Sequence, residues 1–287
     1  MFSALASLLL LGIVPTPALS SGVRELPGIE RLAVAAPNPM KDSLIVPHLS
    51  ASGALLIDAE SGEELFAIDP DTRRPMGSLA KIMTALLVLE RHALHESVVV
   101  PPLVEDIGGS SAGLVVGQRF SVKALLTALL LPSANDAAYT LAVFDGRSLA
   151  TFIRSMNERA TELGLKNTHF ANPAGLDNDQ QFSTPRDLGW LTMAALRQPV
   201  FRELVGSRSA RITANDGRVF DLKNTNELLH YNAEVFGVKT GTTAGAGECL
   251  IVLFKQNDRS YLLILLGSKE RYTDSLHVLR ALSLAMQ

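Results

Sequence analysis

The sequence predicts an α+β fold, with an antiparallel sheet of about five strands, helices on both of its faces and a helical subdomain. Three observations lead to this prediction. Two strand-length apolar runs lie between residues 53 and 68. Segments with helical periodicity follow in the middle of the chain. The last third contains further strand-length runs and ends with a helix. This order suits an antiparallel sheet whose first and last elements are neighbours.

The individual elements follow from apolar periodicity and turn residues. Two apolar runs, 53–58 and 63–68, flank a Gly-containing turn and predict a β-hairpin. An apolar segment from Ser78 to about Arg91 predicts a buried helix, and the Asp258-Arg259 turn makes the last two strands antiparallel neighbours. The remaining expectations are short β segments or loop edges at 98–100 and 114–116, helices at 122–131, 133–144, 148–163, 188–196 and 273–286, a long ordered loop at 166–187, and strands at 211–213, 219–222, 235–240, 248–254 and 261–266.

The N-terminal segment 1–20 has the features of a secretory signal peptide. Met1–Val14 is almost entirely apolar, and Ala18-Leu-Ser20 offers small residues for cleavage. No Lys or Arg precedes the apolar core, so either the true start lies further upstream or the amino terminus alone supplies the positive charge. The alternative to a signal peptide is an uncleaved membrane tether, although the stretch is short for a span. Both interpretations predict a periplasmic or extracellular protein, with membrane contact only if this segment is retained. Residues 21–47 are expected to form an extended leader, and 48–287 the folded domain.

Composition argues against several classes of function. Of the 287 residues 47% are hydrophobic, enough for a substantial core, and the formal net charge is only −3. Nucleic-acid binding favours a basic patch, which this charge does not indicate. The histidines lack metal-ligand spacing, and the single cysteine, Cys249, lies in an apolar run and is expected to be buried. We therefore expect no metal, no cofactor and no nucleic-acid partner.

Ser78 and Lys81 form the first motif that could carry chemistry. Lys81 is the only charge between Leu79 and Leu89, in a helix that is apolar around its circumference. Burial lowers the pKa of a lysine and lets it act as a base. Residues i and i+3 share a helical face, so the Lys81 amine can meet the Ser78 hydroxyl. We predict a nucleophile and its base, although an N-cap serine with a surface lysine would explain most such motifs.

Ser133-Ala-Asn135 is the second motif, and it follows an apolar run and a proline. Ser and Asn are also ordinary helix-start residues, so this motif means little alone. The same pattern recurs in Ser155-Met-Asn157, which we set aside because it falls inside a predicted helix. Ser133 is expected to relay a proton between Lys81 and a leaving amine, and Asn135 to hold the substrate backbone and orient Lys81.

Lys239-Thr240-Gly241 is the third motif, at the end of an apolar strand. Its glycine removes a side chain where a substrate backbone could pack against the strand. Lys239 and the hydroxyls of Thr240 and Thr242 would bind a carboxylate through charge-assisted hydrogen bonds. A solvated lysine before a Gly-rich turn would explain this motif in isolation. The three motifs in this order instead indicate acyl transfer to a serine beside a bound carboxylate.

With these motifs the sequence resembles the D-alanyl-D-alanine carboxypeptidases, low-molecular-mass penicillin-binding proteins of peptidase family S11. The resemblance extends over roughly 52–282 and is carried by the segments 74–85, 135–138, 167–177, 224–226 and 237–241. It implies the penicillin-binding, serine β-lactamase-like fold, with 48–287 as the catalytic domain. Relatives often add a second β-rich domain and an anchoring helix. This chain stops at Gln287, which predicts a soluble secreted enzyme unless the leader is retained.

The resemblance also implies roles for the site residues. Ser78 would attack the carbonyl between two D-alanines of a peptidoglycan stem peptide, and water would hydrolyse the resulting ester. Backbone N–H groups of Ser78 and Thr242 would form the oxyanion hole, and Arg271 would face the substrate carboxylate. Some relatives carry His in place of Thr242, which would alter substrate preference but not the backbone N–H. β-Lactams are expected as covalent inhibitors.

Two other functions compete with this prediction. A class A β-lactamase would need a glutamate to activate the deacylating water, and the loop 167–181 contains none. A catalytically idle penicillin-recognising module, acting as a sensor or scaffold, could lose Ser78 or Lys81 and keep its fold. Retention of all three motifs favours the enzyme. The sequence leaves open whether it would trim pentapeptides, cut cross-links or form them.

Overall fold

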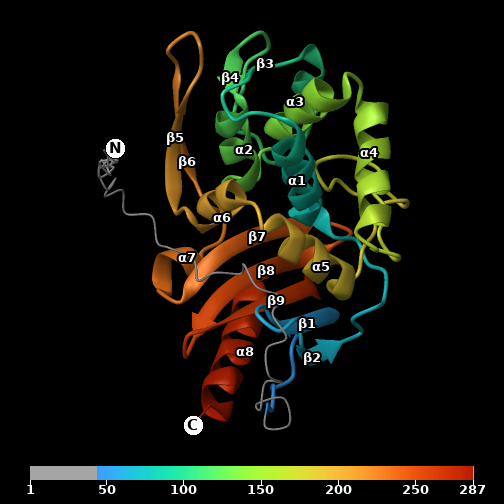
Figure 1. Ribbon diagram of the computed structural model, residues 1–287, viewed down its shortest axis with the longest axis vertical. Coiled ribbons are helices and arrows are strands. Elements are labelled where there is room, and N and C mark those ends of the chain that lie inside the picture. Colours follow the sequence, from blue (N-terminus) through green and yellow to red (C-terminus); the bar gives the residue numbers. More distant parts are fainter. Residues whose placement is uncertain (1–43, 287) are drawn as a thin grey trace, which may run out of the picture.

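The computed structural model describes residues 44–286 (Figure 1). The expected signal peptide, 1–20, lies outside this range, as does most of the expected leader, 21–47. The last leader residues, 44–47, form neither helix nor strand. Within 44–286, no helix combines the length and apolar character that crossing a membrane requires.

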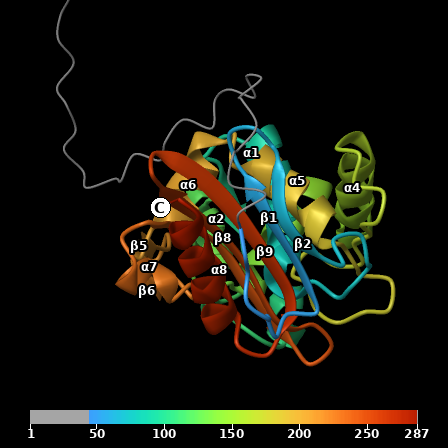
Figure 2. The same ribbon diagram turned by 90° about the horizontal axis from the view of Figure 1, so that it is seen from below.

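An antiparallel five-stranded sheet has the order β2-β1-β9-β8-β7. Its strands are β1 (Gly53–Asp58), β2 (Glu64–Ile68), β7 (Val235–Thr243), β8 (Gly247–Gln256) and β9 (Arg259–Ser268). Strand β1 lies beside β9, with Leu55 opposite Ile264. The first and the last strand of the sheet in sequence are therefore neighbours (Figure 2). The predicted antiparallel sheet with adjacent first and last strands is confirmed.

The turn between β8 and β9 lies one residue earlier than predicted. Asn257 and Asp258 occupy it with φ of 47° and 62°. Two successive positive φ angles match the twist of a two-residue hairpin, and Asn and Asp tolerate them better than other side chains do. The turn therefore fixes the register in which Gln256 pairs with Arg259.

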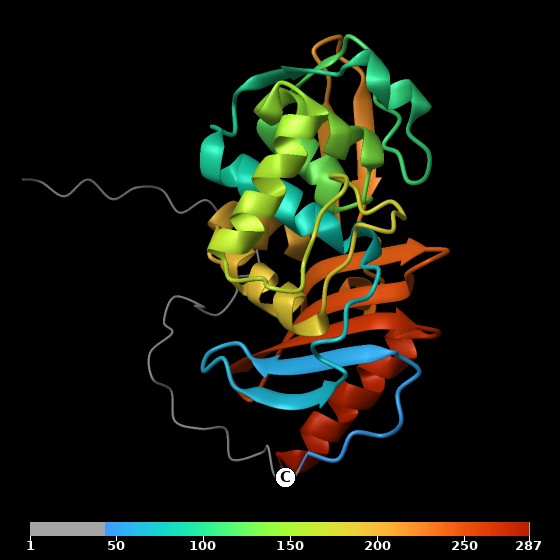
Figure 3. The ribbon, with the colours of Figure 1, turned by 90° about the vertical axis from the view of Figure 1, so that its right-hand side faces the viewer.

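Helices cover both faces of the sheet (Figure 3). On one face α8 (Arg271–Ala285) packs against β8 and β9, and on the other α5 (Pro185–Ala195) packs against β1 and β9. Along β9, Ile264 belongs to the core beneath the helical region, whereas its neighbour Leu265 belongs to the core beneath α8. Because both of its faces are buried, the centre of the sheet in β1, β9 and β8 consists of continuous apolar runs that do not alternate with polar residues.

Helix α1 (Lys81–Arg91) is the centre of the helical region, in contact with α2, α3, α4, α5 and α6. It is buried from Lys81 to Val88, as its apolar circumference predicted. Around it lie η1 (Gly77–Ala80, a 3₁₀ helix), β3 (Ser97–Val99), η2 (Pro102–Asp106, also 3₁₀), β4 (Arg119–Ser121), α2 (Val122–Leu130), α3 (Asn135–Gly146), α4 (Leu149–Glu162) and α6 (Pro199–Gly206).

Several short elements differ from the prediction. Of the two segments expected as short β segments or loop edges, 98–100 overlaps β3, which pairs with β4, and 114–116 lies in a loop. Helix α6 and the one-turn helix α7 (Leu228–Tyr231) were not predicted, and neither was η2. They are too short for apolar periodicity to reveal them. Strands β5 (Ser209–Thr213) and β6 (Val219–Lys223) lie where expected but form a separate two-stranded sheet.

Candidate active site

The structure brings Ser78 and Lys81 together where η1 passes into α1. Lys81 Nζ donates to Ser78 Oγ at 2.8 Å and to the carbonyl oxygen of Ala174 at 2.7 Å. Ser78 belongs to the 3₁₀ turn and Lys81 is the first residue of α1, so the i, i+3 spacing places both side chains on one side of the helix start.

Lys81 is fully buried at the centre of this contact, with a relative exposure of 0%. Burial lowers the pKa of its amine well below the usual value, and the positive charge of Lys239 lowers that pKa further. The negative charge of Asp136 acts in the opposite direction. An amine in this environment loses its proton far more readily than a surface lysine and can then accept one from a hydroxyl.

The long loop between α4 and α5 contacts the segment that carries the nucleophile. Asn172 Oδ1 accepts hydrogen bonds from the backbone N–H groups of Ala174 and Gly175, which fixes the Ala174 carbonyl that Lys81 binds. Gly175 has a φ of 88°, and a Cβ placed there would lie 1.9 Å from the Gly77 carbonyl oxygen and 2.8 Å from Ser78 N. The position therefore admits no side chain.

Gly175→Ala is expected to lower the free energy of unfolding by about 4 kcal/mol or more, because the clash is with backbone atoms that carry the nucleophile. Gly164→Ala is the matched control. Gly164 also has a positive φ, 74°, but a Cβ there would meet nothing within 4 Å, so only the backbone strain of about 1 kcal/mol applies. Urea unfolding of both variants measures the difference, and equal losses would contradict the proposed clash.

Ser133 and Asn135 lie at the start of α3, the helix that packs against α1. Ser133 has a φ of 64° in the turn before the helix, and its buried hydroxyl has no hydrogen-bond partner within residues 44–286. The Asn135 side chain donates to the carbonyl of Gly108 at 2.7 Å. The hydrogen bonds of Lys81 go to Ser78 and the Ala174 carbonyl, so the expected direct orientation of Lys81 by Asn135 is not observed. Asn157 of the rejected motif lies inside α4.

Strand β7 carries the third motif. Lys239 is 1% exposed, and its Nζ donates to the Thr240 carbonyl at 2.9 Å. Burial, and to a smaller extent the charge of Arg271, lowers the pKa of Lys239 to about 7. The Thr240 hydroxyl is paired with that of Thr225 at 2.6 Å. Lys239 is therefore a cation that titrates near neutrality and not the solvated lysine of the alternative interpretation.

Glycines let β7 approach the nucleophile closely. A Cβ on Gly241 would lie 3.0 Å from Ser78 N, and one on Gly77 would lie 3.4 Å from Thr242 N. The two backbone N–H groups expected to form an oxyanion hole are thus carried by segments in contact with each other. An anion placed between two such donors would be stabilised electrostatically.

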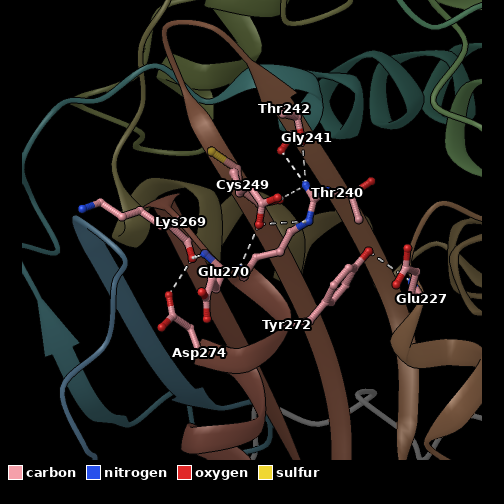
Figure 4. Close-up of polar contacts among 12 residues, drawn as sticks. Glu227, Thr240, Gly241, Thr242, Cys249, Lys269, Glu270, Tyr272 and Asp274 are labelled. Carbon is pink, nitrogen blue, oxygen red and sulfur yellow. Dashed lines mark hydrogen bonds and ion pairs between the residues drawn. The ribbon is translucent and has the colours of Figure 1, made fainter.

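Arg271, at the start of α8, joins this end of β7. Its Nη1 donates to the Gly241 carbonyl at 2.9 Å and to Thr242 Oγ1 at 2.8 Å. Figure 4 shows Thr240, Gly241 and Thr242 in succession along the strand, with Cys249 on the strand beside it. Cys249 is fully buried, as expected, and burial raises the pKa of its thiol to about 11.

Other residues of the site were not identified from sequence. Asp177 accepts hydrogen bonds from Thr243 Oγ1 at 2.5 Å and from Gly245 N at 3.0 Å, so it ties the long loop to the end of β7. The Tyr272 hydroxyl donates to the Thr225 carbonyl and accepts from Glu227 N (Figure 4). These are contacts between distant segments, and no local pattern signals them. Among the described residues, no group of His, Cys, Asp or Glu could hold a metal ion.

Comparison with known proteins points to one family. The sequence profile described as D-alanyl-D-alanine carboxypeptidase matches residues 40–270. D-alanyl-D-alanine carboxypeptidase DacF of Bacillus subtilis is 32% identical over 77% of this chain, which spans only 59% of that relative. The D-alanyl-D-alanine carboxypeptidase of Streptomyces sp. strain K15 is 34% identical over 77% of this chain and 82% of its own length.

Two further matches extend the comparison. A D-alanyl-D-alanine endopeptidase of Escherichia coli is 31% identical over 79% of this chain and 74% of its own. The crystal structure of the Streptomyces K15 DD-transpeptidase superposes with a TM-score of 0.78 at 33% identity, covering 83% of this chain and 98% of that one.

Proposed function

Since the chain belongs to the D-alanyl-D-alanine carboxypeptidase family, we propose that it is a serine enzyme that removes the terminal D-alanine from peptidoglycan stem peptides. The contact between Ser78 and Lys81 supports this most directly, because a fully buried amine lies 2.8 Å from a serine hydroxyl. The geometry is that of an activated nucleophile and its base.

Acylation would use the residues around this contact. Lys81 Nζ takes the proton of the Ser78 hydroxyl as the oxygen attacks the carbonyl between the two D-alanines. The N–H groups of Ser78 and Thr242 hold the oxyanion. When the intermediate collapses, Lys81 returns its proton to Ser133, which donates its own hydroxyl proton to the leaving amine, and terminal D-alanine departs. Water then attacks the ester, returns a proton to Ser78 and releases the shortened peptide.

Substrate selection would rest on the carboxylate of the terminal D-alanine. Lys239, Thr240, Thr242 and Arg271 lie together at one end of β7, where they would bind it by charge-assisted hydrogen bonds. A β-lactam presents a carboxylate beside a strained amide, so the same groups would make it a covalent inhibitor. Export by the N-terminal segment would bring the enzyme to peptidoglycan, outside the cytoplasm.

Cleavage of cross-links is a second candidate, supported by the endopeptidase relatives. It would use the same acyl-enzyme and differ only in the leaving amine. The test is to incubate the protein with a pentapeptide ending in D-Ala-D-Ala and with a cross-linked dimer, and to measure D-alanine and monomer release. D-Alanine release supports the carboxypeptidase, and cleavage of the dimer alone supports the endopeptidase. Penicillin labelling without either product would favour the idle sensor or scaffold.

A bell-shaped pH profile is expected for kcat/KM on carboxylate-bearing peptides. Activity should rise as Lys81 loses its proton and fall above pH about 7 as Lys239 loses its own, although the apparent values belong to the coupled pair. Lys239→Arg keeps the cation at all these pH values and should move the descending limb upward by about two pH units or more. The Lys239→Arg variant must fold and be labelled by penicillin. If the descending limb of its pH profile is then unchanged, Lys239 is not the group that sets this limb.

A further inference from the structure

Asp136 follows Asn135 in the first turn of α3, and its carboxylate is buried with a relative exposure of 4%. The proposed acylation steps do not use it. Among the donors in residues 44–286, its two oxygens accept only from the loop 108–114 and from its own helix: Ser111 Oγ at 2.6 Å and the backbone N–H groups of Ala112 at 3.1 Å, Gly113 at 3.0 Å, Leu114 at 3.1 Å and Ala137 at 2.8 Å. The residues from Gly108 to Ser111 and Gly113 are exposed, so packing alone does not hold this loop.

The other half of the same loop holds Asn135. Asn135 N donates to the Ser110 carbonyl at 2.7 Å, and the Asn135 side chain donates to the Gly108 carbonyl at 2.7 Å. Gly109, between them, has a φ of 84°, and a Cβ there would lie 2.8 Å from Asn135 Nδ2. The position of the Asn135 amide therefore depends on the backbone that Asp136 fixes.

Asp136 also acts on the base by its charge. The charged groups that face Lys81 are Lys239 from β7 and Asp136 from α3, and they shift the pKa of Lys81 in opposite directions. Loss of the carboxylate charge would leave the effect of Lys239 unopposed.

We propose that Asp136 is a positioning residue for acylation, which fixes the loop 108–114 and through it the position of the Asn135 amide. The proposal rests on the proposed function, because it concerns the reaction of Ser78. A purely structural role would predict lower stability with unchanged chemistry in the folded fraction.

Asp136→Asn tests this role. The asparagine keeps one acceptor oxygen, but its NH2 group would face backbone N–H donors that the second carboxylate oxygen now satisfies, so the loop or the start of α3 must rearrange. The second-order rate constant of acylation by a fluorescent penicillin is expected to fall about 10- to 100-fold, the scale of a misplaced positioning group. The ascending limb of its pH profile should shift to lower pH, because the group that raises the pKa of Lys81 has been lost.

Gly109→Ala separates geometry from charge. The added methyl group would displace the Asn135 amide but leaves every charge in place. The acylation rate of Gly109→Ala should fall about tenfold or more. The ascending limb of its pH profile should lie at the same pH as in the wild type. If Asp136→Asn does not fold, this variant still tests the positioning of Asn135, since a wild-type rate would overturn it.

Asp145→Asn is the matched control on the same helix. The Asp145 side chain is 2% exposed and pairs with Arg91 and His92, which are not among the site residues. It should lose stability, with an acylation rate and pH profile like those of the wild type. The inference is overturned if Asp136→Asn matches Asp145→Asn in rate and ascending limb. Failure of the wild type itself to be labelled would instead contradict the proposed function.

Discussion

Ser78→Ala should abolish covalent labelling by penicillin and lower D-alanine release by a factor of about 10⁴ or more. No other group takes the place of a deleted nucleophile, and what remains is the binding and oxyanion stabilisation of the empty site. The backbone around Ser78 is held by Gly175, Gly241 and the Lys81 helix, so the variant should fold. Mass spectrometry of the protein after incubation with penicillin measures the adduct directly.

A matched control is Ser155→Ala, in the Ser-x-Asn pattern that falls inside α4. It should label like the wild type. An adduct of full stoichiometry on Ser78→Ala would place the nucleophile elsewhere and contradict the acyl-enzyme proposed on Ser78.

Lys81→Met should lower the acylation rate by about 10³-fold, within the range for removal of a general base. Methionine fills a similar volume without an amine, so the hydroxyl of Ser78 keeps its proton. Lys123→Met is the control, because Lys123 is a half-exposed surface lysine of α2 paired with Glu203. Stopped-flow acylation measures both variants. A rate within tenfold of the wild type for Lys81→Met would contradict the role of Lys81 as the base.

The lowered pKa of Lys81 should also appear in the pH dependence of the free energy of unfolding, when the wild type is compared with Lys81→Met. The pKa of Lys81 is lowered in the folded state, so between that value and about 10.4 the unfolded chain binds more protons. The free energy of unfolding of the wild type should therefore rise relative to that of Lys81→Met as pH increases from 7 to 10. Lys239 is present in both proteins, so the difference between them reports Lys81 together with its coupling to Lys239. Urea unfolding across this range measures the difference, and a constant gap would mean that Lys81 is not perturbed.

Local patterns were sufficient for much of the fold and for the centre of the site. The apolar circumference of α1 predicted that Lys81 is buried, and the i, i+3 spacing predicted its contact with Ser78. The five strands of the sheet were recognisable as apolar runs. Arg271 was assigned by resemblance alone, and the structure places it against Gly241 and Thr242.

What the sequence could not predict depends on contacts between distant segments. The Ala174 carbonyl that binds Lys81 lies far along the chain, and only the folded loop brings it there. The left-handed backbone of Ser133 is a conformation that serine rarely adopts, so propensity argues against it. The apolar residues of 114–116 left a short strand and a loop edge both open, because a strand needs a partner, and in the structure β3 pairs with β4 while 114–116 lies in a loop.

The pairing of β1 with β9 has a consequence for how this chain matures. Ala54 meets Leu265, so roughly 200 residues must be synthesised before the middle of the sheet can form, and long loops of this kind slow folding. Until then, the face of β1 that later packs against the helical region remains exposed, and such apolar surface promotes aggregation. The newly made chain therefore depends on protection from self-association for longer than a protein built from local contacts.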